Sequence, residues 1–243
     1  MAVPRARVAV AAELLPDTVA VSVIIPGLNE ADCLDRNLTR LLAQPFVADN
    51  CEVIVCDGGS DDDSLDIARR HGCRIVQSAA GRAMQMNRGA ELADGRQLLF
   101  LHADSRLPPN LHEHFPLDAE WGFFRLHLDH RAGIFRVIET AVNLRSRITS
   151  IAGGDQGLFF SRTLFECLGR FPTIPLMEDI AICKAARRKL PPVIVASAIS
   201  SSSRRWQERG ILRTILLMWS LRLAYWLGVD PARLHRLYYP QRG

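Results

Sequence analysis

The 243-residue sequence lacks the cysteine spacing of a metal-thiolate or redox protein, because none of its six cysteines form a C-x-x-C pair. This absence argues against a zinc framework and against a thioredoxin-type site. We interpret all six as packing thiols in a reducing compartment. They are Cys33, Cys51, Cys56, Cys73, Cys167 and Cys183.

The sequence also lacks a strong excess of charge and a long apolar run. Its net charge of +4 is too weak and too dispersed to predict a nucleic-acid partner, and suits an anionic small substrate or an anionic membrane surface equally well. The apolar patch near the N-terminus is too short and too broken by charge for a secretory signal, so a cytoplasmic location is expected. The stretch 211–228 is short for a membrane span and is interrupted by Arg213 and Arg222.

No linker-like stretch or internal repeat divides the chain, so we expect one main domain over 19–206, an N-terminal arm over 1–18 and an extension over 207–243. The first half of the main domain alternates apolar, β-branched runs with helix-like segments. Such alternation predicts a mostly parallel sheet flanked by helices. The expected strands are 19–25, 52–56, 73–78 and 96–101, and the expected helices run from a cap at Asn29 to about 44, from a cap at Ser60 to about 71, and over 82–93.

The second half is less regular but contains further elements. We expect strands over 121–129 and 191–197 and helices over 132–150 and 177–189. A glycine loop running into a strand is expected over 153–161. The acids at the start of the 177–189 helix and the bases at its end suit the helix dipole.

Polar clusters follow three of the expected strands. They are Pro26 to Glu30, Asp57 to Ser60, and His102 to Asp104. Because the carboxyl ends of parallel strands lie on one edge of a sheet, these clusters are expected to form a site together.

Several motifs of the sequence together resemble those of a known family. VSVIIPGLNEADCL, EVIVCDGGSDDDSLDIA, GRAMQMNRGA, LLFLHADSRLP and LMEDIAIC are similar, in order and spacing, to family 2 glycosyltransferases of the GT-A fold. HADSRLPP, GGDQGLFFSR and SSRRW further resemble a bacterial subgroup of selenodomain-associated transferases. The resemblance covers about 19–206, which would then be the catalytic domain. It implies an inverting glycosyltransferase with a nucleotide-diphosphate sugar donor and a divalent metal, Mg²⁺ or Mn²⁺.

The resemblance also implies roles for individual residues. The loop after the first strand, with Pro26, Leu28, Asn29 and Glu30, would line the nucleotide pocket. Asp57, next to Gly58, would read the nucleobase. Arg82 and Asn87 would lie in the segment that closes over the nucleotide. Ala103 would lie beside the nucleotide. Asp104 would bind the metal, and Asp179 would be the general base, with Glu178 orienting it or the acceptor.

Several positions leave alternatives open. His102 stands where the family commonly has an aspartate, so it could ligate the metal, donate to a phosphate or ribose, or only pack at the strand end. Imidazole is a poorer partner for Mg²⁺ than a carboxylate and suits Mn²⁺ better. Asp155 and Gln156 could contact the acceptor or donor sugar, or belong to a backbone bulge. Arg205, next to Trp206, could neutralise pyrophosphate or lie in solvent.

Helical spacing over 211–228 predicts an amphipathic helix. This helix could dock on the catalytic domain, lie in a membrane interface, or form a dimer contact. Tryptophans together with arginines suit an interface, which would fit a lipid or lipid-carrier acceptor at the inner face of the membrane. The acceptor itself is unknown from sequence.

Two alternative functions remain from the residues alone. A nucleotidyltransferase would need a loop rich in glycine and arginine after the first strand, which PGLNE does not supply. A catalytically degenerate nucleotide-sugar-binding protein at a membrane surface is kept open by His102. A nicotinamide dehydrogenase is disfavoured because no G-x-G-x-x-G follows the first strand.

Overall fold

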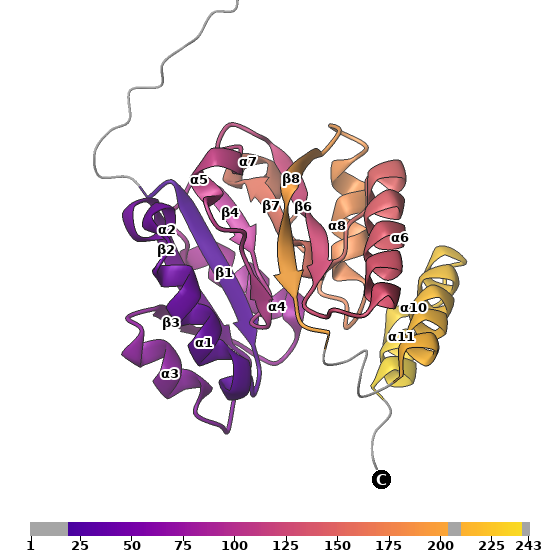
Figure 1. The fold of residues 1–243 in the computed structure, drawn as a ribbon, viewed down its shortest axis with the longest axis horizontal. Helices are drawn as coiled ribbons and strands as arrows, with labels where there is room; N and C mark the ends of the chain where they lie inside the picture. Colours follow the sequence, from indigo (N-terminus) through magenta and orange to yellow (C-terminus); the bar gives the residue numbers. More distant parts are fainter. Residues whose placement is uncertain (1–18, 204–209, 240–243) are drawn as a thin grey trace, which may run out of the picture.

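A computed structural model describes residues 19–203 and 210–239. Its first half consists of strand–helix units (Figure 1). The strands are β1 (Val21–Gly27), β2 (Cys51–Asp57), β3 (Arg74–Gln77) and β4 (Gln97–Phe100), which are joined by α1 (Ala31–Leu42), α2 (Pro45–Asn50), α3 (Ser64–Arg70) and α4 (Arg82–Leu92). The strands β3, β2, β1 and β4 are neighbours in that order and all are parallel.

The second half extends the same sheet in mixed directions. Its strands are β5 (Ser105–Arg106), β6 (Trp121–Leu128), β7 (Leu158–Ser161) and β8 (Val193–Ser201). Its helices are α5 (Leu111–His114), α6 (Gly133–Thr149), the 3₁₀ turn η1 (Gly154–Gln156), α7 (Arg162–Cys167), α8 (Glu178–Ala186), α10 (Ile211–Trp226) and α11 (Pro231–Tyr238). The full order is β3-β2-β1-β4-β7-β6-β8-β5, with β7 antiparallel to both its neighbours and β6 parallel to β8.

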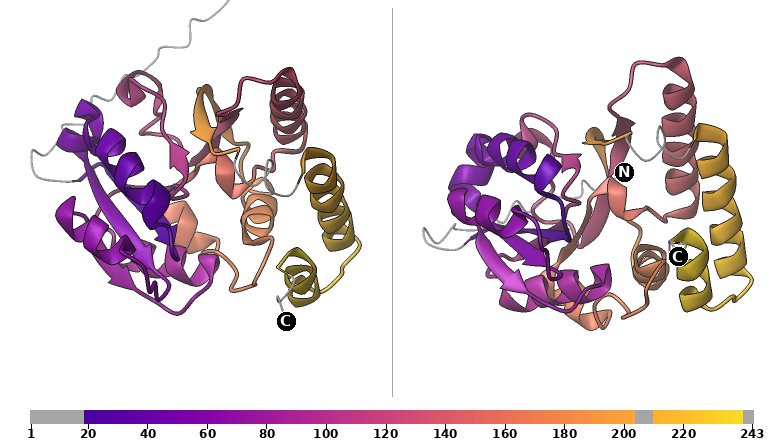
Figure 2. Two further views of the ribbon diagram at one scale, coloured as in Figure 1. Left: turned by 60° about the horizontal axis from the view of Figure 1, so that its bottom comes forward. Right: turned by 90° about the horizontal axis from the view of Figure 1, so that it is seen from below.

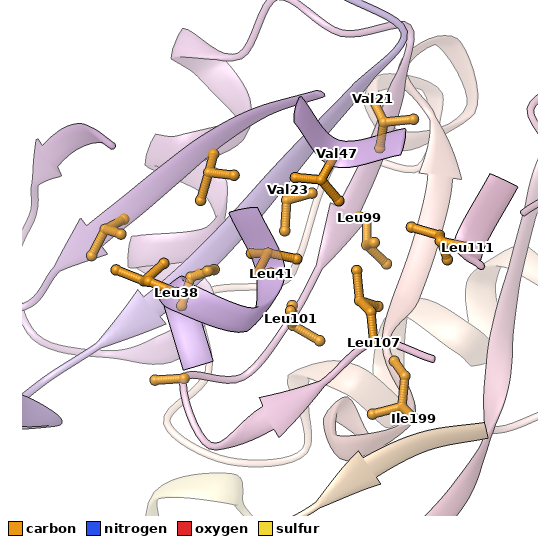
Figure 3. Close-up of a cluster of buried hydrophobic side chains, with 14 of the residues drawn as sticks. Val21, Val23, Leu38, Leu41, Val47, Leu99, Leu101, Leu107, Leu111 and Ile199 are labelled. Carbon is orange, nitrogen blue, oxygen red and sulfur yellow. The ribbon is translucent and has the colours of Figure 1, made fainter. Parts of the chain in front are cut away.

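Alternate side chains of the central strands enter two cores on opposite faces of the sheet. Val21 and Val23 of β1 pack with Leu38 and Leu41 of α1 (Figure 3). Ile24, the residue after Val23, points to the other face and packs with α4, α7 and α8. The sheet is therefore covered by helices on both sides, which explains why β1 and β2 read as nearly continuous apolar runs.

Helix α4 lies unusually close to the sheet at Gly89. A Cβ atom added there would lie 2.4 Å from Sγ of Cys56 and 2.7 Å from Cγ2 of Ile24. Only glycine allows this approach. Gln85 in the first half of α4 bonds to the carbonyls of Gly27 and Cys56, so α4 is also held close to the carboxyl ends of β1 and β2.

The expected α/β architecture is confirmed, but two helix starts are wrong. Asn29 does not cap α1, since Glu30 occupies that position and Asn29 has a left-handed backbone with φ of 55°. Helix α3 begins at Ser64 rather than after Ser60. In both cases the polar side chain instead bonds to the neighbouring loop, as described below.

The cysteines form no disulfide. Cys33, Cys56 and Cys183 are buried, and burial raises the pKa of the thiols of Cys56 and Cys183 to about 12. Packing is therefore the observed role for most of them. Cys167 is the exception, because it is exposed at the end of α7.

The C-terminal helices α10 and α11 lie against the side of the domain next to α6 and α8 (Figures 1 and 2). Leu221 of α10 and Leu234 of α11 are buried with Met177 and Ile180. Lys184 of α8 lies 4.6 Å above the ring of Tyr225. Of the three roles left open for the C-terminal helix, docking on its own domain is thus observed for one of its faces.

Candidate active site at the carboxyl edge of the sheet

The loops after β1 and β2 are tied together by side chains. The backbone N–H of Asn29 donates to Oγ of Ser60 (2.9 Å), and Oδ1 of Asn29 accepts from the N–H of Asp61 (3.0 Å). The N–H of Glu30 donates to Oγ of Ser64 (2.9 Å). The second loop thereby satisfies donors at the start of α1 that have no partner within the helix.

Asp57 organises its own loop. Its carboxylate accepts from the N–H groups of Gly59 and Ser60 and from the Ser60 hydroxyl, at 2.5 to 3.2 Å. Gly58 lies beside Gln85, whose side chain donates to the carbonyls of Gly27 and Cys56. These bonds fix the shape of the loop, but Asp57 itself is buried and lines neither of the two cavities described below.

A cavity of about 600 Å³, which we call the β1–α4 cavity, opens beside these loops. Four of the predicted nucleotide-binding residues line it, namely Pro26, Leu28, Glu30 and Arg82. The cavity is also lined by the loop before α8, by α11 and by the residue that follows α11. Those residues are Thr173, Ile174, Pro175, His235 and Tyr239.

Sequence reasoning missed the contribution of α11. His235 and Tyr239 lie more than 140 residues beyond the last motif residue of this cavity, in a segment without a recognisable signature. Their rings contact each other with centroids 4.9 Å apart. Helical spacing of four residues aligns them on one face, but only the docking of α11 shows that this face meets the cavity.

A second cavity of about 150 Å³, the acidic cavity, adjoins the first and shares Arg82 with it. His102 and Asp104 reach it from the end of β4, Asp155 from η1, and Glu178 and Asp179 from the start of α8. The structure thus brings together predicted residues from three distant segments. The cavity is also lined by apolar side chains, which are Leu176, Met177, Ile180, Leu217, Met218 and Leu221.

Asp179 is held by two backbone donors. The N–H of Gly154 donates to Oδ2 (2.9 Å) and that of Ile180 to Oδ1 (2.7 Å). These bonds and the cations Arg82 and Arg145 favour the charged form, as the position at a helix start predicts. Burial outweighs them, however, and raises the pKa of Asp179 above its ordinary value.

Glu178 is more strongly perturbed. Burial first, and then repulsion from Asp179, raise its pKa to about 7, while Arg82 opposes the shift. The pKa of Asp155 is also raised, chiefly by burial, against the attraction of Arg145. Raised carboxyl pKa values in one cavity are typical of sites that move protons.

His102 packs directly against the glycine loop. A Cβ atom on Gly154 would lie 2.6 Å from Nε2 of His102, so the imidazole occupies the space that a side chain at 154 would need. The second member of this loop, Gly153, lies beside Arg222, whose Nη2 would be 3.5 Å from an added Cβ. Helix α10 therefore supplies a cation to the acidic cavity.

The side chains that line the acidic cavity fit a metal site in which the substrate supplies the remaining ligands. In the described ranges 19–203 and 210–239, no three His, Cys, Asp or Glu side chains are grouped to hold a metal ion by themselves. Asp104 offers a carboxylate and His102 an imidazole on the same cavity wall. Mg²⁺ and Mn²⁺ are commonly bound by one or two carboxylates together with substrate phosphates. Asp104 and His102 are therefore suitable ligands for such an ion.

Three other predicted site residues, Asn87, Gln156 and Ala103, lie outside both cavities and form hydrogen bonds within the protein. The amide of Asn87 clamps the backbone of Phe171, donating at 2.8 Å and accepting at 3.1 Å. Gln156 is fully buried and bonds to Ser146, Gly153 and Phe124. Ala103 is buried, and its carbonyl accepts from Asn37. Arg205 and Trp206 lie outside the described residues.

Comparison with known proteins places part of the chain in a family. The model of the family described as glycosyl transferase family 2 matches residues 22–122. Residues 22–122 form a family 2 glycosyltransferase domain. The predicted family resemblance is confirmed, and the selenodomain subgroup stays a prediction.

Relatives match less than half of the chain. An uncharacterized glycosyltransferase, YibD, of Escherichia coli is 32% identical over 106 residues, which are 41% of this chain and 30% of that protein. A PGL/p-HBAD biosynthesis glycosyltransferase of Mycobacterium bovis is 36% identical over 117 residues, or 42% of this chain and 45% of that one. The chain thus covers less than half the length of either relative.

Solved structures share the fold over more of the chain. Staphylococcus aureus TarS (residues 1–349) has a TM-score of 0.60 at 19% identity, covering 76% of this chain and 60% of TarS. The mannosyltransferase PcManGT of Pyrobaculum calidifontis, solved with GDP-Man and Mn²⁺, has a TM-score of 0.60 at 21% identity, covering 93% of this chain and 65% of that one. The family 2 domain is therefore part of a GT-A fold that continues beyond residue 122.

Proposed function

We propose that this chain transfers a sugar from a nucleoside diphosphate donor to an acceptor hydroxyl, with inversion at the anomeric carbon. The observation that carries the proposal is the pair of adjoining cavities that share Arg82. One has room for a nucleotide, and the other gathers the acids that sugar transfer requires. Arg82 at their junction suits a diphosphate, because its planar guanidinium can bond to two phosphate oxygens.

The nucleoside would occupy the β1–α4 cavity, between the loop after β1 and the wall formed by α11. Asp104 and His102 would hold a divalent cation, which supplies neutralisation of the charge on the departing diphosphate. An imidazole beside the carboxylate favours Mn²⁺ over Mg²⁺. The Mn²⁺ in the PcManGT complex supports the same choice by analogy of fold.

Asp179 is the proposed general base. It faces the acidic cavity, and its carboxylate is fixed by the N–H groups of Gly154 and Ile180. A fixed carboxylate with a raised pKa is better able to accept the proton of an acceptor hydroxyl than an ordinary surface acid. Glu178 would adjust that basicity, because the charges of the two acids repel each other.

The acceptor is proposed to be an amphiphile, such as a lipid or lipid carrier. The acidic cavity is lined by six apolar side chains besides its carboxylates, and three of them come from α10. Such a lining would bury an alkyl part while the hydroxyl meets Asp179. Transfer to alkyl glycosides of increasing chain length tests this, because KM should fall as the chain lengthens, and an unchanged KM would contradict it.

Transfer or hydrolysis of a panel of nucleotide sugars, with Mn²⁺ and Mg²⁺ compared, tests the main proposal. We expect activity with at least one donor, higher with Mn²⁺. Asp179→Asn should bind the donor but lose transfer. If Asp179→Asn keeps full transfer activity, the assignment of the base is wrong.

A further inference from the structure

Helix α6 has an apolar stripe on the side that faces solvent. Ile134, Val137, Leu144 and Ile148 are all exposed, and the last is 73% exposed. Their spacing of three, seven and four residues places them on one face of the helix. The opposite face, with Phe135 and Ile138, packs on β6. Ordinary surface helices bury their apolar stripe, so α6 has one stripe more than the fold requires.

Helix α10 repeats this pattern. Its exposed apolar residues are Leu212, Leu216, Trp219, Leu223 and Trp226, at spacings of four, three, four and three. Trp219 and Trp226 are 70% and 72% exposed. The inner face of α10 is packed on the domain through Thr214 and Leu221, so this outer stripe is separate from the docking contact.

The two helices are neighbours. Ile211 and Ile215 of α10 pack on the cluster of Phe135 and Ile138 beneath α6, and the ribbon views show α6 and α10 on the same side of the molecule (Figures 1 and 2). We call the exposed residues of both stripes the outer face. It comprises Ile134, Val137, Leu144, Ile148, Leu212, Leu216, Trp219, Leu223 and Trp226.

The exposed charged side chains on α6 and α10 themselves are of one sign. Helices α6 and α10 contain five arginines, among which Arg147 and Arg213 are exposed. Their only acid is Glu139, which is buried and paired with Arg136 at 2.8 Å. Exposed Arg233 and Arg236 on the adjoining α11 add to the same charge, and exposed Asp230 at the start of that helix offsets one of them. The outer face is therefore apolar with a basic surround and without an available acid on α6 or α10.

We propose that the outer face docks on the surface of an anionic lipid bilayer. Tryptophans and leucines on one helix face with arginines beside them are the composition of helices that lie in the plane of a membrane interface. The arginines would be attracted to anionic head groups. Within the described residues no helix is long and apolar enough to cross a membrane, so the contact is one of surface association.

A second copy of the chain fits this face less well. A two-fold symmetric contact brings a patch against the same patch of the partner. The exposed arginines would then face arginines, with no exposed acid on α6 or α10 to pair with them. Charge complementarity thus favours the bilayer over a dimer.

The outer face and part of the acidic cavity lie on opposite sides of the same helix, α10. Leu217, Leu221 and Arg222, on the inner side of α10, line the acidic cavity. A bilayer on the outer side would lie about 10 Å away, one helix diameter from the proposed acceptor site. Docking on a bilayer goes beyond the proposed function. Only its relation to the acceptor site rests on that function.

Vesicle flotation of the full chain tests the inference. We expect flotation with vesicles of phosphatidylcholine plus phosphatidylglycerol, little with phosphatidylcholine alone, and a decrease at high salt. The double substitution Trp219→Ser and Trp226→Ser should lower the partition coefficient about tenfold or more. The matched control, Leu117→Ser with Leu190→Ser, removes exposed leucines outside the two helices and should float like wild type.

Absence of flotation with anionic vesicles, or equal flotation of the tryptophan variant and wild type, overturns the inference. A wild-type dimer in sedimentation that the tryptophan variant converts to monomer would also overturn it and assign the face to a second copy. Titration of nucleoside diphosphates with Mn²⁺ into the same preparations separates the two proposals. Nucleotide binding without flotation contradicts the docking alone, and flotation without nucleotide binding contradicts the proposed function alone.

Discussion

The backbone N–H of Gly154 donates a 2.9 Å hydrogen bond to Oδ2 of Asp179. This bond joins the glycine loop before β7 to the acidic pair at the start of α8, 25 residues later. The same glycine leaves room for the ring of His102 from β4. One backbone position thus determines how the proposed base and the proposed metal site lie relative to each other.

Replacement of Asp179 by Asn should lower the rate of transfer by about 10²- to 10⁴-fold, since an amide cannot accept the acceptor proton. The affinity for nucleoside diphosphate with Mn²⁺ should remain within a few-fold of wild type. Steady-state kinetics and calorimetry measure the two quantities. An equal loss of both would indicate that Asp179 serves donor binding instead of proton transfer.

Gly154→Ala should disturb His102, because the new methyl group would lie 2.6 Å from Nε2. We expect a loss of thermal stability and a weaker dependence of nucleotide binding on Mn²⁺. Gly133→Ala is the control, since nothing lies within 4 Å of its added Cβ. The double variant Gly154→Ala with His102→Ala should recover the lost stability, and failure to recover it would show that the two residues do not compete for space.

Glu178→Gln should stabilise the protein at pH 8. The folded-state pKa of about 7 lies above the ordinary value of 4.5, so the stability contributed by protonated Glu178 is complete below about pH 4.5 and is lost as pH rises through 7. At pH 8 the ionised Glu178 lowers the free energy of unfolding by at most about 3 kcal/mol. Melting temperatures at pH 5 and pH 8 measure it. Wild type should lose more stability on this rise than Glu178→Gln, whereas exposed Glu113→Gln should behave like wild type.

His235→Ala and Tyr239→Ala should weaken nucleoside diphosphate binding, because both side chains line the β1–α4 cavity. Loss of one such contact should raise Kd by about 3- to 10-fold. Leu237→Ala is a matched control on α11, since its side chain is exposed and does not line the cavity. Unchanged affinity in both ring variants would show that α11 does not contact the nucleotide.

The sheet edge that carries the site was predictable because local signals are strong there. The buried strands β1, β2 and β4 are apolar runs that stop at polar residues, and parallel pairing aligns those stops. Asp104, Asp155, Glu178 and Asp179 were each predicted, and they meet in one cavity.

What the sequence could not show depends on long-range partners. Asn87 and Gln156 are polar residues in motif positions, but their amides bond to Phe171 and Phe124 across the fold. Asn29 and Ser60 have the residue types of helix caps, yet each finds a closer partner in the other loop. The role of α11 follows only from where it docks, which no local pattern encodes.

The most direct test of the proposed donor site is calorimetric titration of a panel of nucleoside diphosphates in the presence of Mn²⁺. We predict that at least one binds to wild type only when Mn²⁺ is present. Asp104→Asn should lose this Mn²⁺-dependent binding, and Arg82→Ala should bind more weakly. If no nucleoside diphosphate binds, or if Asp104→Asn and Arg82→Ala bind it as wild type does, the two cavities do not form a donor site.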